Sequence, residues 1–286
     1  MKDFSLAGCV ILYNPDDDVV RKIESYVDYI DELYVVDNSN GEHIVNELLQ
    51  KYSNITVLKY NTNMGIAYSL NEVLRRCNTH HTHLMTMDQD SCFTIGSMEK
   101  YVNEVKHFDW DKILGIAPKI VDATATSHCS NVVWEKTIIV ITSGNIISVK
   151  NAITIGGFDE NLFIDEVDHE FCYRGFVRNL LCYTCCSGIY LKHKIGVPLR
   201  KFLIFRYFTA MNHNYIRKYY IFRNRLYVYK RYHHINEKFF FRRYIKHLFY
   251  IFLGILFMEN DKIRKLKYTV KGIGDFYCNS MGRLIE

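Results

Sequence analysis

Apolar and polar positions alternate along the first 90 residues in a pattern that predicts strands and helices in turn. Four apolar runs have the length of a buried strand and cover residues 7–12, 33–36, 55–58 and 83–87. Three segments between them repeat apolar side chains at helical spacing, namely 18–30, 43–51 and 66–76. Strands that alternate with helices of this length predict an α/β fold, with a mostly parallel sheet, right-handed crossovers and helices on both faces.

The last of these strands runs into an acidic turn, Asp88-Gln89-Asp90-Ser91. Two carboxylates one residue apart point to the same side of a strand end, where open α/β sheets place their ligands. Mg2+ and Mn2+ prefer oxygen ligands and often join carboxylates to substrate phosphates. The turn therefore indicates a divalent cation site for a diphosphate-bearing substrate, although Asp-x-Asp alone is also typical of a simple β-turn.

Polar loops follow the neighbouring strands as well. Asp37 opens the turn-forming stretch 37–41, and Asn63 and Gly65 lie in the loop 61–65. In a parallel sheet these loops converge, so we expect them to line one crevice with residues 88–91. Taken alone, Asn63-x-Gly65 is equally typical of a turn that enters a helix.

Several of these segments, taken in order, resemble the motifs of family 2 glycosyltransferases of the GT-A fold. The matching segments are 11–15, 36–39, 63–67 with Asn71, and 87–91. The variant Asp-Gln-Asp-Ser and later segments resemble the bacterial rhamnosyltransferase branch of that family: 143–145, 156–160, 162–165, 168–174, 193–196 and 217–224. The resemblance spans roughly Ala7 to Asn224.

This resemblance implies a reaction. A family member of this branch moves L-rhamnose from dTDP-L-rhamnose, with inversion, to a hydroxyl of a polyprenyl-diphosphate-linked glycan in surface polysaccharide synthesis, such as O-antigen or capsule. Two alternatives stay open: a UDP-sugar donor (galactofuranose or a hexose), and a non-catalytic, membrane-attached glycan-binding protein of the same fold. The presence of Asp88, Asp90 and Asp168 favours catalysis.

The resemblance also implies roles at the donor. Asp37 accepts a hydrogen bond from the pyrimidine base, Tyr13 and Asn14 lie beside that base, and the backbone from Asn63 to Gly65 approaches the nucleoside closely, which glycine permits.

The resemblance places the metal and diphosphate roles on four residues. Asp90 is expected to bind Mg2+ or Mn2+, with Asp88 nearer the ribose or a metal-bound water. His193 ends a long apolar stretch and completes the metal shell in similar enzymes, whereas a lone histidine at a strand end is otherwise a structural group. Arg223, in a tyrosine-rich helix, folds back to contact the donor diphosphate.

Asp168 is the expected general base for the attacking hydroxyl. It aligns with the aspartate of the family's Glu-Asp motif, in which Val167 here replaces the glutamate. A loop rich in carboxylates would raise the proton affinity of a partly buried member. The alternative is capping of the helix expected over 166–179, which also suits Asp165 and Glu170.

The charge is distributed unevenly. Residues 199–286 carry 19 Lys and Arg against 5 Asp and Glu, a net of +14, which leaves −9 for residues 1–198 and recovers the total of +5. We therefore expect a nucleotide-sugar-binding catalytic domain over 1–198 and a basic, aromatic helical region over 199–286. Basic and aromatic helices suit an anionic membrane surface, where a lipid-linked acceptor would lie. No motif for binding nucleic acid is present, and we expect no nucleic acid partner.

The remaining features predict a cytoplasmic protein, peripheral on the inner face of a bacterial membrane. Met1 to Phe4 lead directly towards the first strand without a secretory leader, and the apolar run Leu248–Met258 is too short to span a bilayer. Nine cysteines, an odd number, suit small core residues in a reducing compartment. His80, His81 and His83 are expected in an exposed loop.

Overall fold

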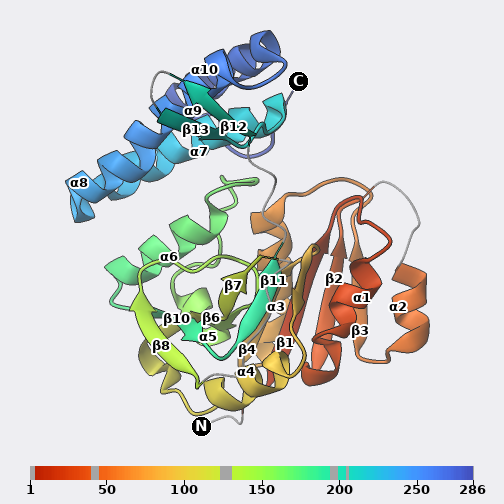
Figure 1. Cartoon of the computed structure of the whole chain (residues 1–286). Helices are drawn as coiled ribbons and strands as arrows, with labels where there is room; N and C mark the ends of the chain where they lie inside the picture. The colour runs from red at the N-terminus through yellow and green to blue at the C-terminus, as the bar shows by residue number, and fades with distance from the viewer. Residues whose placement is uncertain (1–3, 40–44, 123–130, 194–198, 204–205, 286) are drawn as a thin grey trace. The chain divides into compact units, whose positions relative to one another are not determined.

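The computed structural model describes residues 4–39, 45–122, 131–193, 199–203 and 206–285. The chain divides into two compact units (Figure 1). Unit 1 consists of residues 1–160 and 167–194, and unit 2 of residues 161–166 and 195–286. The boundary expected near Pro198 lies outside the described residues.

An eight-stranded sheet forms the centre of unit 1 (Figure 1). In sheet order its strands are β3 (Ile55–Lys59), β2 (Glu32–Asp37), β1 (Leu6–Leu12), β4 (His83–Asp88), β9 (Asn145–Ser148), β6 (Ile113–Ala117), β10 (Leu181–Ser187) and β8 (Val133–Thr137). The first four strands are parallel neighbours. β9 runs antiparallel between β4 and β6, β10 is parallel to β6, and β8 is an antiparallel edge strand. The α/β class with a mostly parallel sheet is thus confirmed.

The helices and 3-10 turns of unit 1 connect these strands. They are α1 (Val19–Glu24), η1 (Val27–Tyr29), α2 (Val45–Lys51), α3 (Ile66–His80), α4 (Ser97–Val105), η2 (Trp110–Lys112), α5 (Val149–Thr154) and α6 (Val167–Val177). The single helix predicted over 18–30 is divided in two, because the Ser25 hydroxyl bonds to the Lys22 carbonyl at 2.6 Å and accepts the Phe93 amide at 3.0 Å. A tertiary contact therefore ends α1 early.

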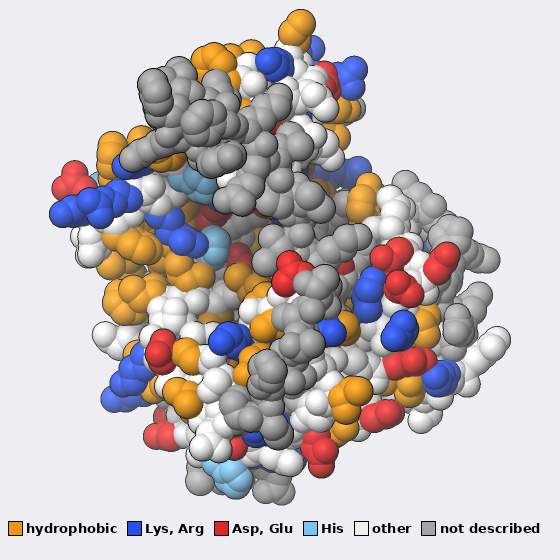
Figure 2. Space-filling view, in the orientation of Figure 1, with side chains coloured by type: hydrophobic (Ala, Val, Ile, Leu, Met, Phe, Trp, Pro, Cys, Tyr) orange, Lys and Arg blue, Asp and Glu red, His pale blue; other side chains and the backbone are white. Residues whose placement is uncertain are grey.

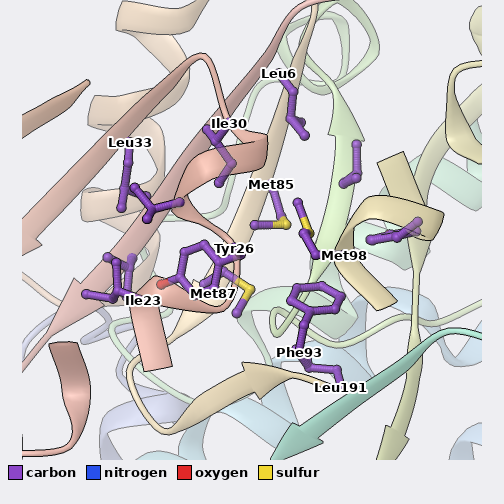
Figure 3. Close-up of a cluster of buried hydrophobic side chains, with 14 of the residues drawn as sticks. Leu6, Ile23, Tyr26, Ile30, Leu33, Met85, Met87, Phe93, Met98 and Leu191 are labelled. Carbon is purple, nitrogen blue, oxygen red and sulfur yellow. The ribbon is translucent and has the colours of Figure 1, made fainter. Parts of the chain in front are cut away.

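The core of unit 1 is a continuous apolar cluster beside the sheet (Figure 3). Strand β4 contributes Met85 and Met87, helix α1 contributes Ile23, and helix α4 contributes Met98, all at most 1% exposed. Because β4 is buried, its last residues are held rigidly where the acidic turn begins.

A second, three-stranded sheet pairs β5 (Ser91–Phe93), β11 (Tyr190–His193) and β7 (Lys119–Val121) in the order β5-β11-β7. β11 is antiparallel to β5, with His193 opposite Ser91. This register connects the acidic turn to a residue about one hundred positions later in the chain.

Unit 2 contains a two-stranded sheet and a set of helices. The strands are β12 (Leu199–Leu203) and β13 (Arg206–Ala210), and the helical elements are α7 (Tyr215–Tyr232), η3 (His233–Ile235), α8 (Glu237–Phe240), the π-helical η4 (Phe241–Lys246), α9 (His247–Phe257) and α10 (Lys262–Tyr277). Helices α7 and α10 approach closely at Gly272, where an added Cβ would lie 2.5 Å from the Tyr219 carbonyl oxygen.

A buried ion cluster connects α7 to α10 in unit 2. Glu259 accepts from Lys218 at 2.6 Å and from Lys265 at 2.8 Å, and all three side chains are at most 4% exposed. Removing one partner of such a cluster leaves a buried charge uncompensated. Lys265, one of the basic residues in the region 199–286 that was expected at a membrane surface, is therefore a structural residue.

His83 differs from the exposed loop expected for it, because it begins β4 and is 7% exposed. Its ring stacks on Phe4 at 4.4 Å between centroids and lies against Trp110 at 4.3 Å. Burial lowers the pKa of His83 to about 4. His81 is also buried, with Nε2 at 3.2 Å from a Glu32 oxygen.

We expect this histidine to make the stability of the protein sensitive to acid. In the unfolded chain His83 takes up a proton as the pH falls below its ordinary pKa of about 6.5. In the folded chain it stays neutral until the pH falls to about 4. Stability is therefore lost as pH falls through this window, by on the order of 3 kcal/mol at about 1.4 kcal/mol per pKa unit. His83→Phe should flatten this part of the curve, as measured by denaturant unfolding with Trp110 fluorescence. Parallel curves for the two proteins would contradict the assignment.

Candidate metal and donor site

The carboxyl ends of three adjacent strands carry the polar residues predicted to converge. In the sheet register Asp37 of β2 lies opposite Leu12 of β1, and Asp88 of β4 lies opposite Ile11. The loops that follow β1, β2 and β4 therefore begin at the same edge of the sheet, as the sequence indicated.

Asp88, Asp90 and His193 come together at this edge. One potential ligand atom from each lies within 4.8 Å of the others. His193 Nδ1 is 3.2 Å from Asp90 Oδ1, and the antiparallel pairing of β11 with β5 brings the imidazole there. The three residues predicted as metal ligands are thus brought together by two different sheets.

Two serines connect these three residues. The Ser143 hydroxyl donates to Asp88 Oδ2, the Ser143 and Ser91 hydroxyls are 2.9 Å apart, and Ser91 Oγ lies 2.8 Å from His193 Nδ1. Both serines lie within motif segments, but the sequence alone assigned them no role. Their positions could have identified them, because Ser91 ends the segment 87–91 and Ser143 begins the segment 143–145.

The loop that carries Ser143 is fixed to β4. Thr86 Oγ1 donates to the Thr142 carbonyl at 2.6 Å, and the Gly144 amide donates to the Thr86 carbonyl at 2.8 Å. Gly144 has a φ of +74°, and a Cβ there would lie 2.7 Å from a Pro118 ring carbon. Only glycine fits this position without strain, so Gly144 allows the loop to present Ser143 to Asp88.

The electrostatics of the cluster favour a cation. Burial raises the pKa of Asp88, although the hydrogen bond from Ser143 opposes this change. Burial also disfavours ionisation of Asp90, but the contact with His193 outweighs it and lowers the Asp90 pKa. The same contact with Asp90 raises the pKa of His193 against the effect of burial. Asp90 Oδ1 is buried and, apart from its 3.2 Å contact with His193 Nδ1, has no hydrogen-bond partner within the described part of the chain. Two carboxylates and an imidazole form a ligand set that fits Mg2+ or Mn2+.

Asp168 lies next to this cluster in unit 1. It stands in the first turn of α6, where its Oδ2 accepts the Thr142 amide at 3.3 Å and its Oδ1 accepts the His169 amide at 2.8 Å. Thr142 directly precedes Ser143, which donates to Asp88, and the negative charge of Asp168 contributes to the raised pKa of Asp88. The predicted base and the predicted metal site are therefore neighbours.

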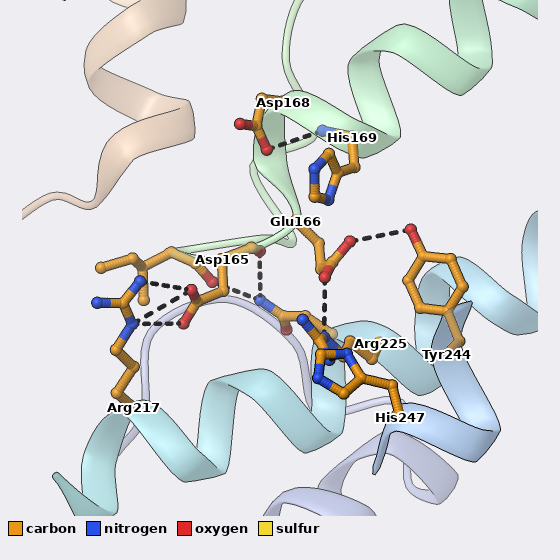
Figure 4. A network of polar contacts seen from close by, with 10 residues as sticks. Asp165, Glu166, Asp168, His169, Arg217, Arg225, Tyr244 and His247 are labelled. Atoms are coloured by element: carbon orange, nitrogen blue, oxygen red, sulfur yellow. Dashed lines mark hydrogen bonds and ion pairs between the residues drawn. The ribbon is translucent and has the colours of Figure 1, made fainter. Parts of the chain in front are cut away.

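The other carboxylates around Asp168 have cationic partners. Glu170 pairs with Arg174 at 2.8 Å inside unit 1. In unit 2, Asp165 pairs with Arg217 at 3.1 Å, and Glu166 accepts from Arg225 and from the Tyr244 hydroxyl, both at 3.0 Å (Figure 4). Among the residues that the structure describes, Asp168 forms no ion pair. The neighbouring carboxylates are thus largely neutralised, while Asp168 keeps a half-buried carboxylate that can accept a proton.

The residues predicted beside the donor base are held at the ends of β1 and β4. The Gln89 side chain accepts from the Tyr13 amide at 2.8 Å and donates to the Tyr13 carbonyl at 3.2 Å. The Asn14 amide donates to Ser39 Oγ at 2.8 Å. The Tyr13 side chain is 53% exposed, so its ring is available to stack on a ligand.

Asp37, Asn63 and Gly65 also lie at this edge. Asp37 is buried and its Oδ1 accepts the Ser39 amide at 2.9 Å. Asn63 Oδ1 accepts the Gly65 amide at 2.9 Å, and Gly65 has a φ of +83° just before α3. Asn63 and Gly65 thus form the helix-entry turn weighed from the sequence, which leaves the backbone there open to close approach.

Arg223 occupies a different environment. It is fully buried within unit 2, where its guanidinium donates to Asn224 Oδ1 and the Tyr219 hydroxyl at 3.0 Å and to the Asn161 carbonyl at 3.3 Å. Arg223 is thus held inside unit 2 by these contacts, and its contact with the donor diphosphate stays a prediction.

Comparison with known proteins agrees with this fold. Residues 9–150 match the family model described as Glycosyl transferase family 2. The S. aureus TarS 1-349 structure in complex with UDP-GlcNAc superposes with a TM-score of 0.60 at 13% identity, over 96% of this chain and 80% of that one. A search of curated proteins found no match.

Two further structures share the GT-A fold. The mannosyltransferase PcManGT from Pyrobaculum calidifontis, in complex with GDP-Man and Mn2+, has a TM-score of 0.56 at 12% identity over 99% of this chain and 77% of that one. GalNAc-T7 with UDP, GalNAc and Mn2+ has a TM-score of 0.54 at 13% identity over 68% of this chain. The chain spans 44% of that GalNAc-T7 structure and 37% of a longer TarS structure.

We expect Asp90→Ala to remove cation binding while the protein stays folded, because a strand-end turn contributes little to the core. Calorimetric titration with Mn2+ should show affinity reduced by at least about 10-fold. Asp17→Ala, which removes an exposed carboxylate elsewhere in unit 1, is the matched control and should bind as the wild type does. Equal affinity of Asp90→Ala and the control would rule out the assigned ligand.

Proposed function

We propose that the protein is an inverting glycosyltransferase that moves a sugar from a nucleoside diphosphate donor to a hydroxyl of an acceptor glycan. The observation that carries this proposal is the grouping of Asp88, Asp90 and His193 beside Asp168, which forms no ion pair among the described residues. Asp88 and Asp90 lie in the segment 9–150 that matches the Glycosyl transferase family 2 model. A non-catalytic glycan-binding protein needs neither a cation site nor a base next to it. Catalysis therefore accounts for the arrangement better.

Each residue then has a chemical task. Asp88, Asp90 and His193 would hold a divalent cation, which would supply positive charge to stabilise the leaving diphosphate. Asp168 accepts the proton of the acceptor hydroxyl as its oxygen bonds to the anomeric carbon and the bond from that carbon to the diphosphate oxygen breaks. Attack opposite the leaving group inverts the configuration. Ser143 orients the Asp88 carboxylate by its hydrogen bond, and Ser91 orients the His193 imidazole in the same way.

The donor we propose is dTDP-L-rhamnose. The support for it is that the motifs between Ala7 and Asn224 follow one another in the same order as in the rhamnosyltransferase branch. A UDP-sugar is the second candidate, supported by the UDP-GlcNAc and UDP complexes of structures with the same fold. Both donors carry a pyrimidine with an N3–H group that Asp37 could accept from. The two candidates are distinguished by incubating the protein with a panel of sugar nucleotides and measuring whether dTDP or UDP is released.

The acceptor we propose is a polyprenyl-diphosphate-linked glycan at the inner face of the cytoplasmic membrane, with unit 2 on the anionic surface. Helix α9 supports this, because Phe249, Tyr250 and Phe257 are 57%, 47% and 58% exposed. Arg242 and Lys246 precede them and are exposed, as are Lys262, Arg264 and Lys267 of α10. No helix of the described residues is both long and apolar enough to cross a bilayer.

Asp168→Asn keeps the shape of the side chain and removes its basicity. If Asp168 is the base, kcat should fall by roughly 100-fold or more while KM for the donor changes little, because the base acts in the transition state. Steady-state kinetics with saturating acceptor measures both. Loss of donor affinity at normal kcat would assign Asp168 a binding or capping role instead.

Five exposed cations should hold the protein on an anionic surface, each contributing on the order of 1 kcal/mol. Replacing Arg242, Lys246, Lys262, Arg264 and Lys267 with glutamine should weaken sedimentation with anionic liposomes and lower the ratio of activity on lipid-linked acceptor to activity on a short soluble acceptor. Lys265 is left in place, because it belongs to the buried ion cluster with Glu259.

The matched control replaces the same number of exposed cations in unit 1: Arg21, Lys112, Lys119, Lys136 and Lys150. The control should stay bound at low ionic strength. If both variants dissociate to the same extent, net charge and not unit 2 determines membrane binding.

A further inference from the structure

A basic groove in unit 2 lies beside the helical run formed by α8, η4 and α9. Its volume is about 620 Å3, and it is lined by Asn236, Lys238, Phe239, Arg242, Arg243 and His247. Figure 2 shows Lys and Arg side chains next to hydrophobic ones over the part of unit 2 where α8 lies. None of these residues belongs to the metal and donor site.

The groove presents hydrogen-bond donors with little negative charge to neutralise them. Glu237 is the only carboxylate in the sequence from 233 to 258. Lys238 and Arg242 are exposed, and within the described part of the chain neither forms an ion pair. Asn236 Oδ1 is occupied by the Phe239 amide at 3.0 Å, so its amide NH2 remains to donate. Such a set of donors selects an anion.

His247 supports the same conclusion from inside the groove. Its Nδ1 lies 2.7 Å from a terminal nitrogen of Arg225, whose Nε is 3.0 Å from Glu166. Burial and then the positive charge of Arg225 lower the pKa of His247, an effect that Glu166 opposes and Arg243 and Lys218 reinforce. Arg225 is thus balanced by Glu166, while Lys238 and Arg242, which form no ion pair among the described residues, stay available to a ligand.

The apolar surroundings indicate what the anion is attached to. Phe239, on the groove wall, is 38% exposed, and Lys246 lies over the Tyr250 ring at 5.7 Å, one turn further along the same helical run. Beyond it α9 exposes Phe249 and Phe257. A phosphate ester in the groove would have its apolar chain next to exposed aromatic side chains, as at a membrane surface.

We propose that this groove binds the phosphate or diphosphate ester of a lipid, namely the carrier of the acceptor glycan. The assignment rests on the proposed function, and it adds a second recognition site to it. Asp88, Asp90 and His193 of unit 1 would hold the cation that binds the donor diphosphate, whereas Lys238 and Arg242 of unit 2 would contact the lipid diphosphate directly.

The test compares two double variants of equal charge change. Lys238→Gln with Arg242→Gln alters the groove, and Lys262→Gln with Lys267→Gln alters exposed cations of α10 outside it. Binding is measured by sedimentation with phosphatidylcholine vesicles that carry a polyprenyl diphosphate, and with vesicles in which phosphatidylglycerol supplies the same surface charge. Both variants should fold as the wild type does in thermal unfolding, since all four side chains are exposed.

The groove variant should lose about 10-fold or more in affinity for the diphosphate lipid, while both variants lose equally on phosphatidylglycerol. Equal losses on the diphosphate lipid would overturn the groove as a site. Inorganic pyrophosphate is the soluble probe. Competition between pyrophosphate and the diphosphate lipid supports the proposal. Tight binding of pyrophosphate without any preference for the diphosphate vesicles would show that the ligand is a free phosphate and not a lipid. Sugar transfer by the wild type to a short soluble acceptor tests the proposed function separately, since vesicle binding requires no donor.

Discussion

The structure of unit 1 depends on placing two carboxylates close together at the end of a buried strand. Asp88 and Asp90 repel each other, and burial makes their ionised forms more costly still. The protein offsets this with a hydroxyl from Ser143 and the imidazole of His193. Beyond this contact with the imidazole, Asp90 Oδ1 has no hydrogen-bond partner among the described residues. The remaining negative potential is what a divalent cation would neutralise.

This constraint explains several local features of the chain. The loop with Ser143 is hydrogen-bonded to Thr86 and turns at Gly144, where only glycine fits without strain. Strand β11 pairs with β5 in the register that brings His193 opposite Ser91. Asp168 accepts the amide of Thr142, so the predicted base is held by the same loop that supports the metal group. One short segment thereby connects both chemical functions.

Charge is handled differently in unit 2. Carboxylates there are few, and two of them are buried against cations: Glu166 with Arg225, and Glu259 with Lys218 and Lys265. The remaining Lys and Arg side chains stay at the surface beside exposed aromatic rings of α9. An acidic unit with a cation site and a basic unit with an amphipathic surface thus follow from the division of charge along the sequence.

The sequence by itself determined the strands up to Asp88 and the convergence of Asp37 and Asp88, because hydrophobic periodicity is a local property and helical crossovers between strands favour a parallel sheet. It also determined the helices between these strands, except that a contact with Phe93 divides the helix expected over 18–30. It also indicated Asp90, Asp168 and His193 through motif resemblance. Only the tertiary structure decided which residues support them. The antiparallel β9 and β8, the hydroxyls of Ser91 and Ser143, the burial of Arg223 and the pairing of Lys265 all depend on contacts between residues far apart in the chain. Periodicity cannot predict these, because side chains with the same local pattern meet different partners once the strands have paired.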